Sequence, residues 1–333
     1  MKKVVYGGLF LALIGIGFSS CKKEDLGNTV VNQGSGIGKN HIPTFESMED
    51  LNDRLELLSK MSEEERRTYE NETNAKSLLT KVYEVYEGID LENLTSQSEL
   101  QNYVDLHSST LELRTDRNKE YEYRPYFSDN EYSIVANEDR LVVVGETCIK
   151  IFDDGIVTTD KANISLLSDI NEVSVENILP TDELFVSKIS TEEIITRAAC
   201  NPTYNEDIET SGKERTKLFV HVAKTTISTD DLTGLTLHNA KLYGRIRPYK
   251  KTLGIWYHAR RTISGKIKAA ASFSALGSSS EYLSINTSYS SQKAYSVTAS
   301  HSKNKLSVAG LSINSIDSWG DTPSTSSTSI NCN

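Results

Sequence analysis

The sequence predicts an α+β protein with an N-terminal helical module, then a mainly antiparallel β region and a C-terminal β-sandwich-like domain. Between residues 44 and 130, apolar residues recur at three- and four-residue steps, the period of an amphipathic helix. From residue 131 onward the pattern changes to alternation with a period of two, which is typical of half-buried strands. A chain of 333 residues with 37% hydrophobic content is long enough for two domains.

Three helices are expected within the module over residues 44–130. Each begins after a serine that can accept a hydrogen bond from the first turn, and two of these serines are followed by a glutamate three residues later. The expected helices follow Ser47, with apolar positions Met48, Leu51, Leu55 and Leu58; Ser62, continuing to Gly88; and Ser96, continuing to Leu106.

Residues 131–212 are expected to form a small β-hairpin region followed by an acidic connector. Asp153-Asp154-Gly155 separates two strand-like runs, and Asp-Gly supplies the positive φ that a tight hairpin turn requires. Cys148 lies within this hairpin and is expected to be a small packed side chain. Two further strands are predicted at 132–135 and 141–144.

Residues 213–318 are expected to form the C-terminal β-rich domain. Several short segments with alternating apolar and polar residues follow one another at a spacing of about ten residues, which favours a sandwich or barrel. Residues 319–333 are rich in Ser and Thr and are expected to be a polar tail.

The net charge of −10 conceals two oppositely charged halves. Residues 1–212 hold 20 basic and 40 acidic residues, whereas residues 213–333 hold 16 basic and 6 acidic residues. Such asymmetry can indicate a face that binds polyanions. The alternative is that the two halves attract each other or keep the protein soluble.

The candidate ligand-binding residues lie in the stretch 241–268, which contains nine Lys or Arg residues and no acidic residue. Arginine side chains suit phosphate or carboxylate groups, and aromatic rings suit sugar or base faces. Arg245 and Arg247 would share one face of a strand, because residues two apart do so. The alternative is that the aromatic residues fill the core while the cations face water or the acidic half. The predicted ligand-binding residues are Arg245, Arg247, Lys250, Trp256, Tyr257, Arg260 and Arg261.

The sequence contains no recognisable catalytic or metal-binding motif. The six histidines are scattered and none has the HExxH spacing, and no GxSxG motif is present. We therefore expect no catalytic residue, no metal site and no cofactor. Cys148, Cys200 and Cys332 fit no zinc pattern, and their pairing stays open.

The N-terminus has the layout of an export signal. Met1-Lys2-Lys3 precedes an apolar run over 4–18, which is too short to span a bilayer comfortably. The sequence Phe18-Ser19-Ser20-Cys21 resembles the lipobox of bacterial lipoproteins. That resemblance implies that residues 1–20 are a signal peptide and that Cys21 is lipidated. Residues 21–43, which are polar and Gly-rich, are then expected to be a flexible tether.

Two further stretches resemble lipoproteins of the Bacteroidota. The sequence over 21–26 is similar to the surface-export signal of that group, a lysine followed by two acidic residues after the cysteine. The segments 45–47, 58–66 and 69–70 resemble a helical module of uncharacterised Bacteroidales lipoproteins, although Asn74-Ala75-Lys76-Ser77 replaces the usual Gly-Phe-x-Ser. The resemblance implies an outer-membrane, surface-exposed location and an architecture, but no reaction.

These observations predict a lipid-anchored envelope protein with a non-catalytic binding or structural role. Its expected partners are the membrane, through the N-terminal lipid, and an anionic glycan or lipid headgroup; nucleic acid is not expected. A glycan-acting hydrolase is the alternative. A third hypothesis, an adhesin or pore-type assembly, follows from residues 272–315, where 17 of 44 residues are Ser or Thr and alternation is steady. The oligomeric state stays open.

Overall fold

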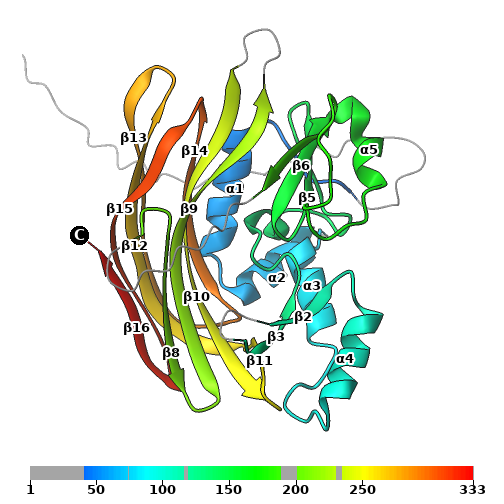
Figure 1. Cartoon of the computed structure of the whole chain (residues 1–333), viewed down its shortest axis with the longest axis vertical. Helices are drawn as coiled ribbons and strands as arrows, with labels where there is room; N and C mark the ends of the chain where they lie inside the picture. Colours follow the sequence, from blue (N-terminus) through cyan, green and yellow to red (C-terminus); the bar gives the residue numbers. More distant parts are fainter. Residues whose placement is uncertain (1–40, 74, 116–118, 189–200, 230–234, 333) are drawn as a thin grey trace, which may run out of the picture.

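The computed structural model describes residues 41–73, 75–115, 119–188, 201–229 and 235–332. Within these ranges the protein is mostly β, with 51% of residues in strands and 20% in helices. The strands form a five-stranded, a seven-stranded and a four-stranded sheet. Figure 1 shows the long strands of the C-terminal part on one side of the molecule, and the helices and the small sheet on the other.

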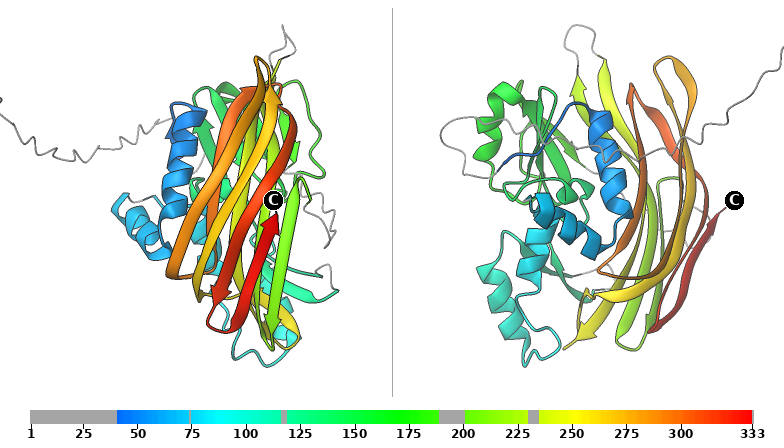
Figure 2. Two further views of the ribbon diagram at one scale, coloured as in Figure 1. Left: turned by 90° about the vertical axis from the view of Figure 1, so that its left-hand side faces the viewer. Right: turned by 180° about the vertical axis from the view of Figure 1, so that it is seen from behind.

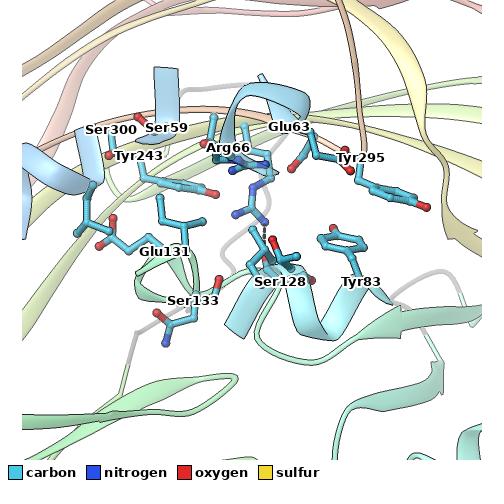
Figure 3. A pocket seen from close by; sticks show the side chains of 18 of the residues that line it. Ser59, Glu63, Arg66, Tyr83, Ser128, Glu131, Ser133, Tyr243, Tyr295 and Ser300 are labelled. Carbon is cyan, nitrogen blue, oxygen red and sulfur yellow. Dashed lines mark hydrogen bonds between the residues drawn. The ribbon is translucent and has the colours of Figure 1, made fainter. Parts of the chain in front are cut away.

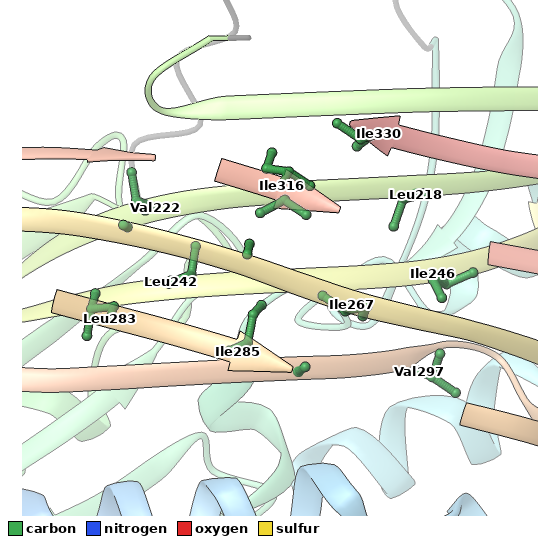
Figure 4. Packing of buried hydrophobic residues seen from close by; sticks show 14 of the residues in the cluster. Leu218, Val222, Leu242, Ile246, Ile267, Leu283, Ile285, Val297, Ile316 and Ile330 are labelled. Carbon is green, nitrogen blue, oxygen red and sulfur yellow. The ribbon is translucent and has the colours of Figure 1, made fainter. Parts of the chain in front are cut away.

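The C-terminal part is a sandwich of two layers of antiparallel strands. One layer contains β8 (Tyr204–Ser211), β9 (Glu214–Thr229), β10 (Thr236–Thr252) and β14 (Val297–Leu306). The other contains β13 (Ser278–Ala294), β12 (Arg261–Ala275), β15 (Ala309–Thr322) and β16 (Thr325–Cys332). Alternate residues of each strand point inward, so one apolar cluster fills the space between the layers (Figure 4). The strands predicted here are confirmed in type but are longer than the sequence pattern indicates.

The end of the chain is a strand. Residues 319–333, expected to be a polar tail, contain the last residues of β15 and all of β16, which pairs with β15. Thr328, Ile330 and Cys332 are buried, and Ser329 and Asn331 between them are exposed. β16 lies beside β8 of the opposite layer, as Figure 2 shows, so this edge of the sandwich is covered.

The helices are α1 (Met48–Lys60), α2 (Glu63–Thr73), α3 (Leu78–Tyr86) and α4 (Gln97–Leu106), with a short α5 (Ile164–Ser168) further along. The predicted caps are confirmed: Ser47 accepts from Asp50 N, and Ser96 accepts from Glu99 N. Ser62 and Glu65 form the reciprocal capping box.

Two predicted elements are wrong. The helix expected to run from Ser62 to Gly88 is divided into α2 and α3, because Ser77 caps a new helix by accepting a hydrogen bond from Thr80 N. The strand expected at 132–135 is the 3₁₀ helix η1 (Glu131–Ile134), in which Asn130 accepts a hydrogen bond from Tyr132 N. In both cases a local side-chain cap outweighs the apolar pattern.

The predicted α+β class, with a separate helical module before the β region, is also wrong. A strand, β1 (Thr44–Phe45), precedes α1 and pairs in parallel with β4 (Leu141–Val144). Two more strands, β2 (Leu111–Thr115) and β3 (Tyr121–Pro125), lie within the stretch predicted to be helical. They extend the larger sandwich sheet, because β3 pairs with β11 (Ile255–His258).

The physical reason is that the helices have no core of their own. Leu51, Leu55 and Leu58 of α1 pack in one cluster with residues of the five-stranded sheet. Tyr86 of α3 and Leu100 of α4 pack in another cluster with residues of β2, β3 and β11. The helices therefore form a layer on strands rather than a module.

The five-stranded sheet consists of β1, β4, β5 (Thr147–Ile151), β6 (Gly155–Asp160) and β7 (Phe185–Lys188) in that order. The predicted hairpin is confirmed, with Ile151 opposite Ile156 across the turn. The expected positive φ at Asp-Gly is wrong, because neither Asp154 nor Gly155 adopts one. Cys148 is fully buried, as expected for a packed side chain, and it is a free thiol, which resolves for this residue a pairing that the sequence left open. Cys332 is disulfide-bonded.

Residues 1–40, which include the predicted signal peptide, Cys21 and most of the tether, lie outside the described residues. Among the helices that the structure describes, none is both long and apolar enough to cross a membrane.

Candidate functional site

The two faces of β10 determine where the basic stretch lies. Ala240, Leu242 and Ile246 point into the sandwich core. Residues of odd number therefore point to the opposite face, where the sheet meets the helices and η1. Lys241, Arg245 and Arg247 are all buried in that contact.

Arg245 and Arg247 share one face, as predicted, and both bind Asp129. The Arg247 guanidinium lies 2.8 Å from Asp129 Oδ1, and Arg245 pairs with the same oxygen. Both arginines also donate to the backbone carbonyl of Ser128, and Arg124 pairs with Asp129 Oδ2. Burial would raise the pKa of Asp129, but Arg247, Arg245 and Arg124 outweigh burial and hold that pKa well below its usual value.

The other predicted ligand-binding residues lie at separate places along the same contact. All but Tyr257, which is buried among helix residues, contact a carboxylate. The contacts are Lys250 with Glu92 at 2.6 Å, Trp256 Nε1 with Glu120 at 2.9 Å, Arg260 with Glu63 at 3.5 Å and Arg261 with Glu214 at 3.0 Å. The structure thus brings Arg245 and Arg247 together and distributes the rest.

Two histidines lie beside this charged contact, of which His258 is fully buried and His221 is partly buried. His258 Nε2 lies 3.3 Å from Arg247 and 3.7 Å from Glu122 Oε1. Burial and Arg247 lower the pKa of His258 to about 3, despite Glu122. His221 stacks with Phe219 and lies beside Tyr243, and burial with Arg245 lowers its pKa to about 4. Both rings are therefore neutral at neutral pH.

A cavity of about 50 Å³ lies where α1, α2, α3 and η1 face β10 and β14. Figure 3 shows Glu63, Arg66, Tyr83, Tyr243 and Tyr295 around it. About 10–15 Å³ of such space holds one water molecule, so this cavity admits a small polar group and not a whole sugar ring.

Arg66 differs from the other arginines of the described chain. Its guanidinium lines the cavity, yet it has no hydrogen-bond or ion-pair partner among the residues that the structure describes. The two carboxylates of the cavity wall are already engaged, Glu63 by Arg67 at 2.9 Å and by Arg260, and Glu131 by Lys241. Burial lowers the pKa of Arg66, although Glu63 lies near it.

The remaining wall of the cavity is aromatic and hydroxyl-rich. Tyr83 and Tyr295 stack with their ring centroids 4.4 Å apart, and Tyr295 donates a hydrogen bond to Glu87. The hydroxyl of Tyr243 is buried and has no hydrogen-bond partner among the described residues. Five serines and two threonines also line the cavity, namely Ser59, Thr80, Ser128, Ser133, Ser296, Thr298 and Ser300. The rest of the lining is Leu55, Arg67, Leu79, Asn130, Ile134 and Arg245.

A wider groove of about 370 Å³ lies next to this cavity, between α1 and β14. Leu55 and Ser300 belong to the walls of both, so the two spaces are neighbours. The groove is lined mainly by polar side chains, among them Asn52, His301 and Asn304.

Sequence reasoning did not identify Arg66, Asp129 or the tyrosines as members of a site. Arg66 follows three glutamates at the start of α2, so in the sequence its charge is one of many in a charged run. The guanidinium of Arg66 lacks a partner because the carboxylates near it are already paired with other residues. A sequence pattern does not show which carboxylates are paired. Within the described ranges, no group of His, Cys, Asp or Glu is arranged to hold a metal ion.

No protein-family model matches the chain, and the search of curated proteins also finds no match. Among solved structures, the chain is similar to a DUF4848 family protein from Bacteroides thetaiotaomicron at 14% identity. The match covers 87% of this chain and 97% of the other, with a TM-score of 0.28. A score this low does not establish a shared fold, so we do not assign the chain to that family.

Proposed function

We propose that this chain is a lipid-anchored cell-envelope protein with a non-catalytic binding or structural role at the outer-membrane surface. The observation that carries the proposal is the sequence Phe18-Ser19-Ser20-Cys21 after a short apolar segment, with a polar, Gly-rich stretch behind it. The folded part supports a binding role, since it contains a polar cavity whose guanidinium has no partner among the described residues. Two or more acyl chains on Cys21 would give stable anchoring, where one chain is marginal.

Replacing Cys21 tests the anchor. We expect the parent protein, expressed in a bacterial host that lipidates exported proteins, to enter the detergent phase in Triton X-114 partitioning. The Cys21→Ser variant should stay in the aqueous phase, because serine cannot form the thioether. Cys148→Ala is the control, since it removes a buried thiol far from the signal and should partition like the parent. Detergent partitioning of Cys21→Ser at the parental level would overturn the proposal.

The hydrolase alternative receives no support from the cavity. A glycosidase needs one carboxyl group to protonate the leaving oxygen and a second to act as base or nucleophile. Here Glu63 contacts Arg67 and Arg260, and Glu131 pairs with Lys241. Neither carboxyl group is presented free to a substrate in this arrangement.

A further inference from the structure

The charge at Arg66 indicates which ligand the cavity would accept. The side chain of every other arginine of the described chain forms a hydrogen bond or an ion pair to a described residue, whereas the guanidinium of Arg66 forms neither. Glu70, a carboxylate near Arg66, accepts hydrogen bonds from Ser77 and Thr80 through its Oε1. A half-buried guanidinium without a partner favours an anion, and its planar fork matches an anion with two oxygens.

The surrounding carboxylates favour a single negative charge over two. Glu63 and Glu131 belong to the cavity wall, and Glu70 lies near Arg66. A phosphate monoester would bring up to two negative charges into this setting, whereas a carboxylate brings one. The small size of the cavity also suits a carboxylate, which has only three heavy atoms.

The rest of the lining favours a polyhydroxyl body on that carboxylate. Tyr83, Tyr243 and Tyr295 present rings and hydroxyls, and the Tyr243 hydroxyl lacks a partner among the described residues. The adjoining groove is about seven times larger by volume, 370 against 50 Å³, and is lined by amides, hydroxyls and charged groups. Sugar hydroxyls both donate and accept, so such a lining can satisfy them.

We infer that this protein binds the carboxylate of an acidic sugar at Arg66, with the sugar chain continuing into the groove between α1 and β14. The inference rests on the proposed binding function and adds its site and its ligand class. It places the ligand away from Arg247 and Arg261, which pair with Asp129 and Glu214.

Calorimetric titration of the purified full chain tests the inference, with digalacturonate, a neutral galactose disaccharide and inorganic phosphate as probes. We expect digalacturonate to bind at least about tenfold more tightly than the neutral disaccharide. Arg66→Gln should weaken digalacturonate binding by about tenfold or more. Its melting temperature should stay close to that of the parent, because Arg66 has no partner among the described residues to lose. Arg66→Lys should restore part of the affinity, since it keeps the charge without the fork.

Lys60→Gln is the matched control. It removes one positive charge at the end of α1, beside the cavity residue Ser59, but Lys60 is exposed and its ion pair with a described residue is the surface pair with Glu56. Its affinity for digalacturonate should stay within about twofold of the parent. Equal binding by Arg66→Gln and the parent, absence of digalacturonate binding, or tighter binding of inorganic phosphate would each overturn the inference. These outcomes leave the Cys21 partitioning result unchanged, so the two proposals fail separately.

Discussion

At the scale of single residues, Asp129 forms ion pairs with the buried arginines of β10, so these arginines hold the structure together. Asp129 contacts Arg245, Arg247 and Arg124, three cations from two segments of the chain. Placing charges in the interior is costly unless each is paired and hydrogen-bonded. Here Asp129 and the Ser128 carbonyl compensate Arg245 and Arg247, and Arg124 also pairs with Glu112 and Asp153. Removing Asp129, or one of the arginines that it contacts, would therefore leave an uncompensated charge and lower the free energy of unfolding.

His221 and His258 predict how stability depends on pH. Their pKa values are lowered to about 4 and about 3, against about 6.5 in the unfolded chain. Between pH 6.5 and about 4 the unfolded chain binds protons that the folded protein excludes, so the free energy of unfolding falls as pH falls. The loss should be on the order of 3 kcal/mol for each ring.

Urea unfolding at pH values from 7 to 4.5 measures this slope, and His221→Phe isolates one ring. Phenylalanine keeps the stack on Phe219, and the Nδ1 atom it removes has no hydrogen-bond partner among the described residues. The variant should show a shallower decline than the parent. Identical slopes for the two proteins would refute the assignment of this pH dependence to His221.

The residue scale also shows what sequence can and cannot predict about the site. The common face of Arg245 and Arg247 follows from strand geometry alone and is confirmed. The partner Asp129 is 116 residues away from Arg245 along the chain, and no periodicity connects them. Whether Arg245 and Arg247 bind an external ligand stays a prediction. Their ion pairs with residues of the acidic half agree with the other interpretation of the charge asymmetry, in which the two halves attract each other.

At the scale of elements, caps and turns were predictable and lengths were not. Ser47 and Ser96 act through contacts within a few residues, and the turn at 153–155 joins two strands that are adjacent in the sequence, so the sequence pattern identifies them. The helix break at Ser77 and the 3₁₀ helix at 131–134 also depend on local caps, but an apolar pattern hid both. β3 depends on the distant strand β11 for pairing, which explains why it was missed, whereas β2 and β16 pair with their neighbours in the sequence, β3 and β15.

Because β12 and β15 lie close to β10 at Gly265, we expect a methyl group added at this residue to destabilise the protein. A Cβ at Gly265 would lie 2.5 Å from Ile246 Cδ1 and 2.6 Å from the backbone oxygen of Trp319. The backbone of a paired strand cannot easily move, so overpacking at this point should reduce the free energy of unfolding by about 1–3 kcal/mol.

Urea denaturation of Gly265→Ala checks this prediction, with Ser280→Ala as the control. Ser280 is exposed on β13, and its side chain can be shortened without touching the core. The control should unfold within about 0.5 kcal/mol of the parent. If Gly265→Ala matches the control, the two sheets are less tightly packed at this point than the structure shows.

At the scale of the whole molecule, the charge asymmetry brings acidic residues of the first half into ion pairs with basic residues of the second half. The acidic residues Asp129, Glu120 and Glu92, all before residue 213, contact cations of the chain beyond residue 213. Strand pairing between β3 and β11 joins the two parts in the same place. The halves that looked like separate domains by composition therefore share a sheet and a charged contact.

Replacing Arg247 tests most directly whether the basic stretch holds the molecule together. Arg247 is buried and contacts Asp129, the Ser128 carbonyl and His258, so Arg247→Gln should lower the free energy of unfolding by about 3–5 kcal/mol in urea denaturation. Lys268→Gln removes an exposed cation of the same stretch and should change that free energy by less than about 1 kcal/mol. An Arg247→Gln protein as stable as Lys268→Gln would contradict the account.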